Sequence, residues 1–253
     1  ITGGLDRNTT LDGGNTTRVF RVANASLQLN DVNIKNGYAT FGGAITATDS
    51  VLTLNHVNFV HNTAYEKSGG AVFAYGGSSI SFSGETAFLN NSSNYDGGAL
   101  YVVNSDISWE AESSFSENRA HFLGNTATIG GGGAILVGDS SIVKWSGETS
   151  LTSNTCGSQG GALSSRASSL TTEGTLIFDN NTSGLNGGGI AFLGGMSASF
   201  SSRNITFSDN KAGGSGGGVF ISAPGEGPTF INATFLSNVA EKGGGVFING
   251  CGT

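Results

Sequence analysis

The sequence has few prolines, few cysteines and few charged residues. Its 253 residues include 2 prolines, 2 cysteines and 11% charged residues, well under the usual quarter for a globular domain. Lys and Arg nowhere form a run and the net charge is −7, so nucleic acid and anionic membranes are poor partners. No apolar stretch approaches the ~18 residues of a transmembrane helix, so we expect no membrane insertion by this segment.

The sequence is instead rich in glycine and in small polar residues. The 43 glycines show no Gly-X-Y period, which excludes collagen. A hydrophobic content of 37% is enough for a core and argues against disorder. This composition favours an all-β extracellular protein. No signal peptide is visible, and the chain begins at ITGG and ends at FINGCGT within its own pattern, so we expect a segment of a longer protein.

The strongest feature is a repeated Gly-Gly-small-aliphatic motif, first met at Gly42–Ile45. Successive Gly pairs are separated by 27, 28, 35, 28, 27, 29 and 27 residues. The pairs begin at Gly42, Gly69, Gly97, Gly132, Gly160, Gly187, Gly216 and Gly243. Such a period indicates a stacked solenoid. The glycines are expected at corners, where the backbone bends sharply or approaches the next coil closely.

A second motif, Phe-x-x-Asn, recurs in step with the first. We expect its aromatic residue to point inward and its asparagine to satisfy turn amides and to pair with the asparagine of the next coil. The predicted ladder contains Asn62, Asn91, Asn118, Asn154, Asn181, Asn210 and Asn238. Alternating stretches such as SSISFSGETAF are strand signals, and no stretch has a helical period. The prediction is an all-β fold: a right-handed parallel β-helix of about nine coils, one domain over residues 1–253.

One interval between Gly pairs is longer than the others. Because Phe115 follows Gly97 at the usual distance, we assign the additional residues to 119–125, RAHFLGN, and expect a loop insertion there. Loops on a rigid scaffold often carry function. A merely tolerated insertion is the alternative.

The coupled motifs resemble the repeats of chlamydial polymorphic outer membrane proteins, over residues ~32–249. Similar repeats occur in large surface proteins of algae and other protists. The resemblance implies the β-helical passenger of an autotransporter, acting in surface display and adhesion. It carries over only scaffold positions, Gly42–Ile45 and Phe59 with Asn62 and their equivalents, and supplies no catalytic residue. The chain shows no translocator barrel, so secretion by that route is not implied.

A column of carboxylates is the sharpest candidate for catalysis. Glu85, Glu112 and Glu148 each stand three residues before the motif Phe or its equivalent, so on consecutive coils they would lie about 5 Å apart. That spacing suits a retaining carboxylate pair or a shared cation in a polysaccharide lyase or hydrolase. However, repetition alone creates such columns, SGET is simply reused, and no Lys or Arg column flanks them. We therefore expect no enzyme.

No cofactor or metal site is expected. His56, His61 and His121 lack metal-ligand spacing. The glycine runs contain no Gly-Lys-Ser/Thr and open no helix, so they are not phosphate loops. Cys156 and Cys251 lie at least three coils apart, beyond the reach of a disulfide.

Asn-x-Ser/Thr sequons are frequent. Asn91 and Asn181 lie on the inward ladder, so their preceding neighbours are the better acceptors. The candidate acceptors are Asn8, Asn15, Asn24, Asn90, Asn180, Asn204 and Asn232. If the source is a eukaryote, we expect glycans above all at Asn204 and Asn232, one coil apart on the outward column.

The preferred function is an extracellular structural or adhesive protein at the cell surface. Uncovered β ends favour stacking, so the expected partners are copies of itself or flanking coils end to end, forming a fibre or appendage. A host receptor or glycans are further expected partners. The alternatives are a polysaccharide-binding module and a polysaccharide lyase or hydrolase of β-helix type.

Overall fold

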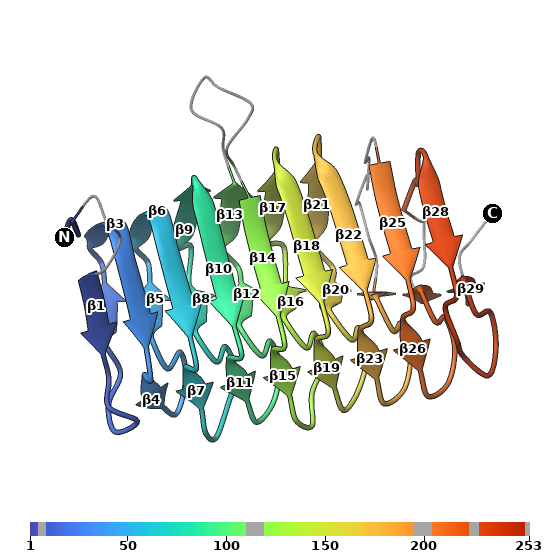
Figure 1. Cartoon of the computed structure of the whole chain (residues 1–253), viewed down its shortest axis with the longest axis horizontal. Helices are drawn as coiled ribbons and strands as arrows, with labels where there is room; N and C mark the ends of the chain where they lie inside the picture. Colours follow the sequence, from blue (N-terminus) through green and yellow to red (C-terminus); the bar gives the residue numbers. More distant parts are fainter. Residues whose placement is uncertain (5–8, 110–118, 195–203, 223–227, 251–253) are drawn as a thin grey trace.

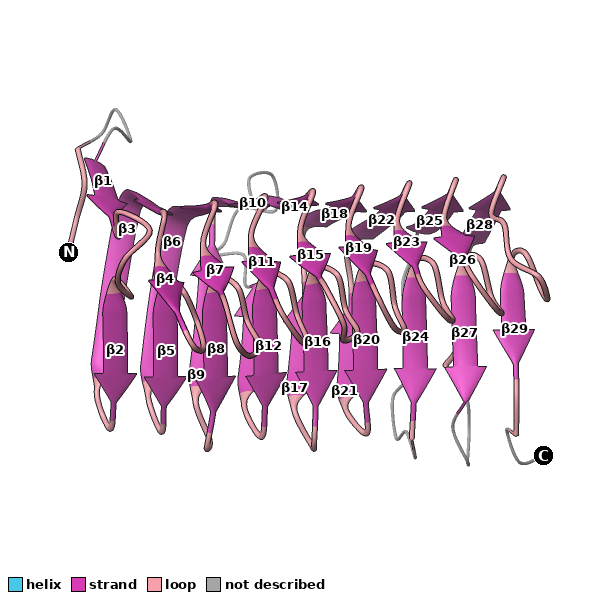
Figure 2. Ribbon diagram, turned by 90° about the horizontal axis from the view of Figure 1, so that it is seen from below, coloured by secondary structure: helices cyan, strands magenta, loops and turns pink. Residues whose placement is uncertain are grey.

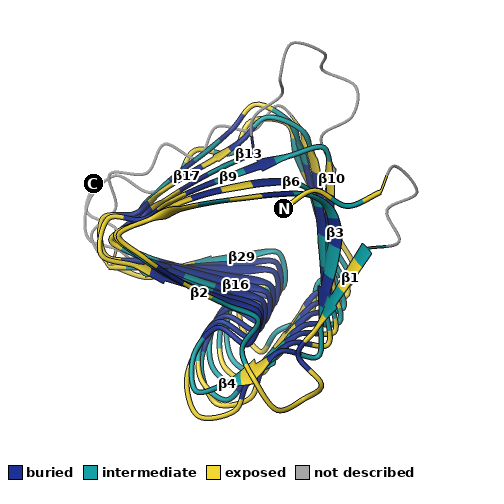
Figure 3. Ribbon diagram, turned by 90° about the vertical axis from the view of Figure 1, so that its left-hand side faces the viewer, coloured by how far each residue is buried: buried dark blue, intermediate teal, exposed yellow. Residues whose placement is uncertain are grey.

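A computed structural model describes residues 1–4, 9–109, 119–194, 204–222 and 228–250. The regular elements of this described part are all strands, wound into a solenoid in which each strand pairs in parallel with its equivalents in the neighbouring turns (Figure 1). Seen from the N-terminal end, the chain runs clockwise as it recedes, so the winding is right-handed (Figure 3). The predicted fold class is confirmed.

Sheet A is the largest of three sheets that run along the solenoid, with 13 strands. It bends at a corner where the backbone enters the left-handed region, at Asp31 (φ 55°), His56 (φ 51°) and Gly84 (φ 65°). Its strands are β1 (Thr9–Asp12), β3 (Ser26–Lys35), β6 (Val51–Val60), β9 (Ser79–Ser83), β10 (Glu85–Leu89), β13 (Asp106–Trp109), β14 (Arg119–Leu123), β17 (Ile142–Trp145), β18 (Glu148–Thr152), β21 (Ser169–Thr172), β22 (Thr175–Asp179), β25 (Asn204–Ser208) and β28 (Ala233–Leu236).

Sheets B and C complete each turn, and Figure 2 shows their strands side by side along the rod. Sheet B has nine strands: β2 (Phe20–Ala23), β5 (Ile45–Thr48), β8 (Val72–Tyr75), β12 (Leu100–Val103), β16 (Ile135–Gly138), β20 (Leu163–Arg166), β24 (Ile190–Leu193), β27 (Val219–Ser222) and β29 (Val246–Ile248). Sheet C has seven: β4 (Tyr38–Ala39), β7 (Thr63–Ala64), β11 (Ser92–Ser93), β15 (Thr126–Ala127), β19 (Thr155–Cys156), β23 (Thr182–Ser183) and β26 (Lys211–Ala212).

The number of complete turns is about seven rather than nine. Within the described residues, seven turns contribute a strand to each of the three sheets. The first turn contributes β1 and β2, and the last contributes β28 and β29, to sheets A and B alone. The expected count of nine therefore included two turns that are incomplete in sheet C.

The Gly pairs form the corner that leads from sheet C into sheet B. The first glycine of each pair bends the chain: Gly160 has φ 74°. The second glycine allows close stacking, because a Cβ on Gly161 would clash with the carbonyl oxygen of Gly188 in the next turn. Both expected roles of the glycines are present at this corner.

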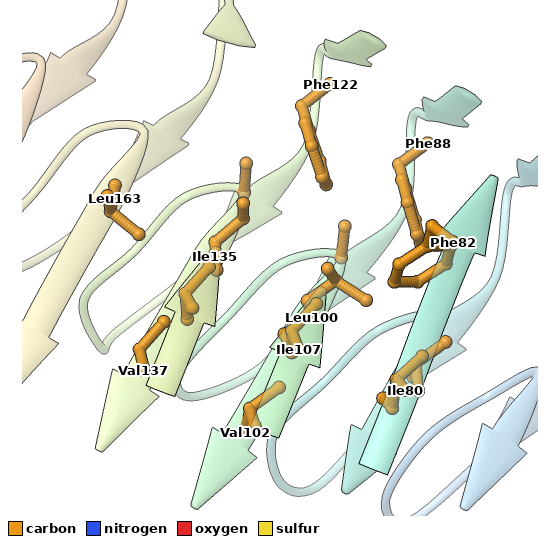
Figure 4. Close-up of a cluster of buried hydrophobic side chains, with 14 of the residues drawn as sticks. Ile80, Phe82, Phe88, Leu100, Val102, Ile107, Phe122, Ile135, Val137 and Leu163 are labelled. Carbon is orange, nitrogen blue, oxygen red and sulfur yellow. The ribbon is translucent and has the colours of Figure 1, made fainter. Parts of the chain in front are cut away.

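The core lies between the inward faces of sheets A and B. In Figure 4, Phe88 and Phe122 lie parallel, and their ring centroids are 4.7 Å apart. Phe59 continues the stack at 4.8 Å from Phe88. Aliphatic side chains from both sheets fill the space beside the rings, including Ile80, Leu100, Val102, Ile107, Ile135, Val137 and Leu163, all 1% exposed or less.

The prediction of a loop at 119–125 was wrong. Residues 119–123 form β14, which pairs residue for residue with β10 and β18, so that Phe88, Phe122 and Leu151 share one register. Thr126–Ala127 is β15 of sheet C. The additional length therefore precedes β14, within 110–118, outside the described residues. In this register the number of residues between Asn125 and the Gly132 corner lies within the range of the other turns. Strand β15 can therefore pair with both of its neighbours in sheet C, which is the physical reason for the register.

Candidate functional site

The asparagine ladder is the most regular polar feature of the interior. From Asn91 onward, each Oδ1 accepts hydrogen bonds from the backbone amide and from the Nδ2 of the preceding ladder residue, as in the 3.0 Å bonds from Asn125 to Asn154. The Oδ1 of Asn62, the first of the ladder, accepts from the backbone amide of Gly37. The ladder contains Asn62, Asn91, Asn125, Asn154, Asn181, Asn210 and Asn238. Asn125 thus holds the place predicted for Asn118, which itself lies outside the described residues. The ladder is scaffold, because Asn62, Asn125 and Asn154 are 0% exposed.

The carboxylate column does not have the predicted form. Strand pairing aligns Glu85 with Arg119, and Arg119 with Glu148. Glu85 and Glu148 are therefore two turns apart, roughly 10 Å by strand spacing, instead of occupying consecutive coils. Glu112 lies outside the described residues. The error has the same cause as the misplaced loop, namely a register shifted by seven residues in this turn, and the retaining pair at about 5 Å is lost with it.

The other residues predicted from the sequence do not come together in one site within the described part of the chain. Asn15, Asn24, Asn90, Asn180, Asn204 and Asn232 are exposed, and Asn8 lies outside the described residues. Cys156 is a buried free cysteine, and the prediction about its pairing with Cys251 involves a residue that is not described. Among the described residues, no group of three or more His, Cys, Asp and Glu side chains could hold a metal ion. None of the described segments forms a helix both long and apolar enough to cross a bilayer.

A groove of about 460 Å³ lies on the outer face of sheet B. It is lined by Arg18, Arg21, Phe41, Thr46, Thr48, Phe73, Tyr75, Tyr101 and Val103. These residues come from four successive turns, around β2, β5, β8 and β12 (Figure 2). Further along the same outward row, Leu136, Ser164 and Ala191 are buried, so the groove is confined to the early turns.

The groove combines stacked aromatic rings with two guanidinium groups. Phe73 and Tyr101 stack with their ring centroids 5.2 Å apart, and Phe41 meets Phe73 at 4.7 Å. Arg18 donates to the carbonyl oxygen of Phe41 at 2.8 Å, while Arg21 is exposed. Burial lowers the pKa of Arg18, and the positive charge of Arg21 lowers it further. Burial raises the pKa of Tyr101, with a smaller contribution from the charge of Asp96.

Sequence reasoning missed this groove, although a signal for it was present. The residue after the motif aliphatic alternates outward in every sheet B strand, and it is Thr46, then Phe73, then Tyr101. A comparison of outward rather than inward positions between repeats would have located the aromatic cluster.

Comparisons with known proteins agree with the repeat. No curated protein and no solved structure gave a significant match. Residues 79–103, 175–192 and 204–222 match the Chlamydia polymorphic membrane protein repeat. Each of these segments starts in sheet A, passes through sheet C and the Gly pair, and ends in a strand of sheet B: β12, β24 or β27. The resemblance predicted from the two motifs is confirmed: in three of its turns, this chain carries repeats similar to those of the Chlamydia polymorphic membrane proteins.

Proposed function

We propose that the protein is an extracellular β-helical rod that acts in adhesion or display at a cell surface. The observation that carries the proposal is how the repeat residues are used: the Gly pairs, the Asn ladder and the stacked Phe rings all serve packing between turns. Such a scaffold holds outward side chains in fixed rows for contact with a partner. The matched repeats belong to a membrane protein family that is not an enzyme family, which supports a surface role over catalysis.

Adhesion can be tested with beads carrying the purified chain at measured density. We expect them to attach to target cells more often than beads carrying the same chain heat-denatured before coupling. Equal attachment of both bead types would contradict an adhesive role of the folded rod. Antibodies against the chain should also label intact, unpermeabilised cells of its source. Labelling only after permeabilisation would contradict the surface location.

End-to-end assembly into fibres and glycosylation at Asn204 and Asn232 are two further predictions from the sequence. Electron microscopy of the native protein tests for fibres, and isolated monomers alone would contradict assembly. Glycopeptide mass spectrometry tests Asn204 and Asn232, and two unmodified peptides would contradict glycans there.

A further inference from the structure

We infer that the groove on sheet B binds a carboxylate-bearing sugar residue of an acidic glycan. The inference rests on the adhesive function proposed above, to which it assigns a ligand class. Four observations carry it: the shape of the groove, its charge, its aromatic wall and the pairing of the strands beneath it.

The groove exists because short side chains precede aromatic ones in two outward rows. One outward row runs Arg21, Thr46, Phe73, in register on β2, β5 and β8. In the parallel row, Ala23 and Thr48 precede Tyr75. The short threonine side chains leave a step between the guanidinium groups on one side and the rings on the other. The resulting volume of about 460 Å³ is in the range of small-ligand sites.

The charge of the groove favours an anionic ligand. Both charged residues that line it, Arg18 and Arg21, are cationic, in a chain whose net charge is −7. Within the described residues, Arg21 has no ion-pair partner, and the contacts of Arg18 are neutral carbonyl oxygens of Phe41 and Gly42. A guanidinium group forms paired hydrogen bonds with a carboxylate, which makes a carboxylate the favoured anion.

The aromatic wall of the groove favours a ligand that also has an apolar surface. The rings of Phe41, Phe73 and Tyr75 lie together there, with Phe73 and Tyr75 at 5.3 Å. The floor between the two walls carries threonine hydroxyls, and that of Thr48 makes no hydrogen bond in the described part of the chain. A sugar ring with a carboxylate matches this arrangement, because it has an apolar C–H face, hydroxyls along its edge and one negative charge.

A peptide strand is a poorer occupant. Strands β5 and β8 under the groove are each hydrogen-bonded to a neighbour on both sides, so a peptide could not extend the sheet there.

The test is calorimetric titration of the purified chain with trigalacturonic acid, its methyl ester and a sulfated neutral trisaccharide. We expect the acid to bind, and the ester and the sulfated sugar to bind at least about tenfold more weakly. No binding of the acid, or equal binding of the ester, overturns the inference. Equal binding of the sulfated sugar overturns the preference for a carboxylate and with it the assigned ligand class.

Variants locate the site. Arg21→Ala should weaken binding of the acid at least about tenfold, and Arg21→Lys less, because it keeps the charge but not the paired donors. Thr48→Tyr should block binding by filling the step with the side chain found one turn later. Lys211→Ala is the control: it removes one exposed positive charge from sheet C, on the turn of β26, and should bind like the wild type.

Melting curves show which variants are folded. If folded Arg21→Ala binds like the wild type, the groove is not the site, whatever Thr48→Tyr does. Failure of the ligand assignment is separable from failure of the proposed function. Beads that adhere to cells while the acid does not bind contradict only the ligand, whereas binding of the acid without bead adhesion contradicts only the adhesive role.

Discussion

At the scale of single residues, a ladder asparagine uses its whole carboxamide. The Nδ2 of Asn154 donates to the carbonyl oxygen of Phe122 and to Oδ1 of Asn181, both at 3.0 Å. Its Oδ1 accepts two hydrogen bonds from Asn125. No other side chain of this size offers two donors and an acceptor of two bonds, which is why the motif repeats asparagine rather than aspartate or serine.

Replacing one ladder residue should destabilise the rod strongly. Asn154→Ala removes the acceptor that serves two donors of Asn125, its backbone amide and its Nδ2, and one donor to the carbonyl of Phe122, so we expect a loss of about 3 kcal/mol or more in the free energy of unfolding. Denaturant titration measures it. Thr155→Ala, exposed and adjacent, is the control and should change stability by about 0.5 kcal/mol or less. Equal effects of the two substitutions would contradict the assigned role of the ladder.

The buried thiol makes stability depend on alkaline pH. Burial raises the pKa of Cys156 from 9.0 to about 12, despite opposing hydrogen bonds from backbone amides. Between these values the unfolded thiol has lost its proton and the folded one has kept it. The folded state then binds more protons, so stability should fall as the pH rises above about 9, by at most about 1.4 kcal/mol per pH unit.

Comparison with Cys156→Ala isolates this effect from other titrations. Unfolding free energies of both proteins are measured with a reductant present at about pH 8 and about pH 10.5. The advantage of the wild type over the variant should shrink at the higher pH. A difference that does not change with pH would show that Cys156 does not contribute.

At the scale of the turn element, the second glycine of a pair tolerates a side chain less well than a glycine within a strand. The second glycine is constrained by the neighbouring backbone, whereas Gly138 in β16 is not. A Cβ at Gly138 would have Cγ2 of Val103 as its nearest neighbour, at 3.4 Å, which is an ordinary contact.

A matched pair of substitutions tests the corner. Gly161→Ala drives a methyl group into the carbonyl oxygen of Gly188 and should cost more than about 3 kcal/mol or prevent folding. Gly138→Ala should be neutral or stabilise by up to about 1 kcal/mol, because glycine is costly in a strand. Circular dichroism melting curves compare the two. Similar melting temperatures would rule out the proposed steric role of the second glycine.

At the scale of the whole molecule, each turn contacts chiefly its two neighbours, so the cooperativity of unfolding acts mainly between adjacent turns. The backbone amides of Asn62, Asn125, Asn154 and Asn210 report on it, because each donates to the next ladder residue.

Hydrogen exchange followed by NMR should reveal the gradient. We expect the central amides, Asn125 and Asn154, to exchange only through global unfolding. Asn62 and Asn210 should open at a lower free energy, by about 1 kcal/mol or more, because fewer turns must separate. Identical opening free energies at all four positions would indicate a single cooperative unit instead.

The sequence by itself determined the repeat, the parallel β-helix and the roles of the Gly pairs and of most ladder asparagines. These features depend on local chemistry repeated in every turn: a left-handed corner, a missing Cβ, and a side chain with two donors and an acceptor. The resemblance to the Chlamydia polymorphic membrane protein repeat follows from the same motifs.

Only the tertiary structure decided the register of the fifth turn and the position of the groove. Phe115 and Phe122 begin locally equivalent motifs, and the hydrogen bonds of β14 to β10 and β18 select Phe122. This choice put Asn125 in the ladder and separated Glu85 from Glu148. The groove likewise depends on side chains brought together from four turns. Their sequence separation hides them, because strand pairing between turns, and not proximity along the chain, makes them neighbours.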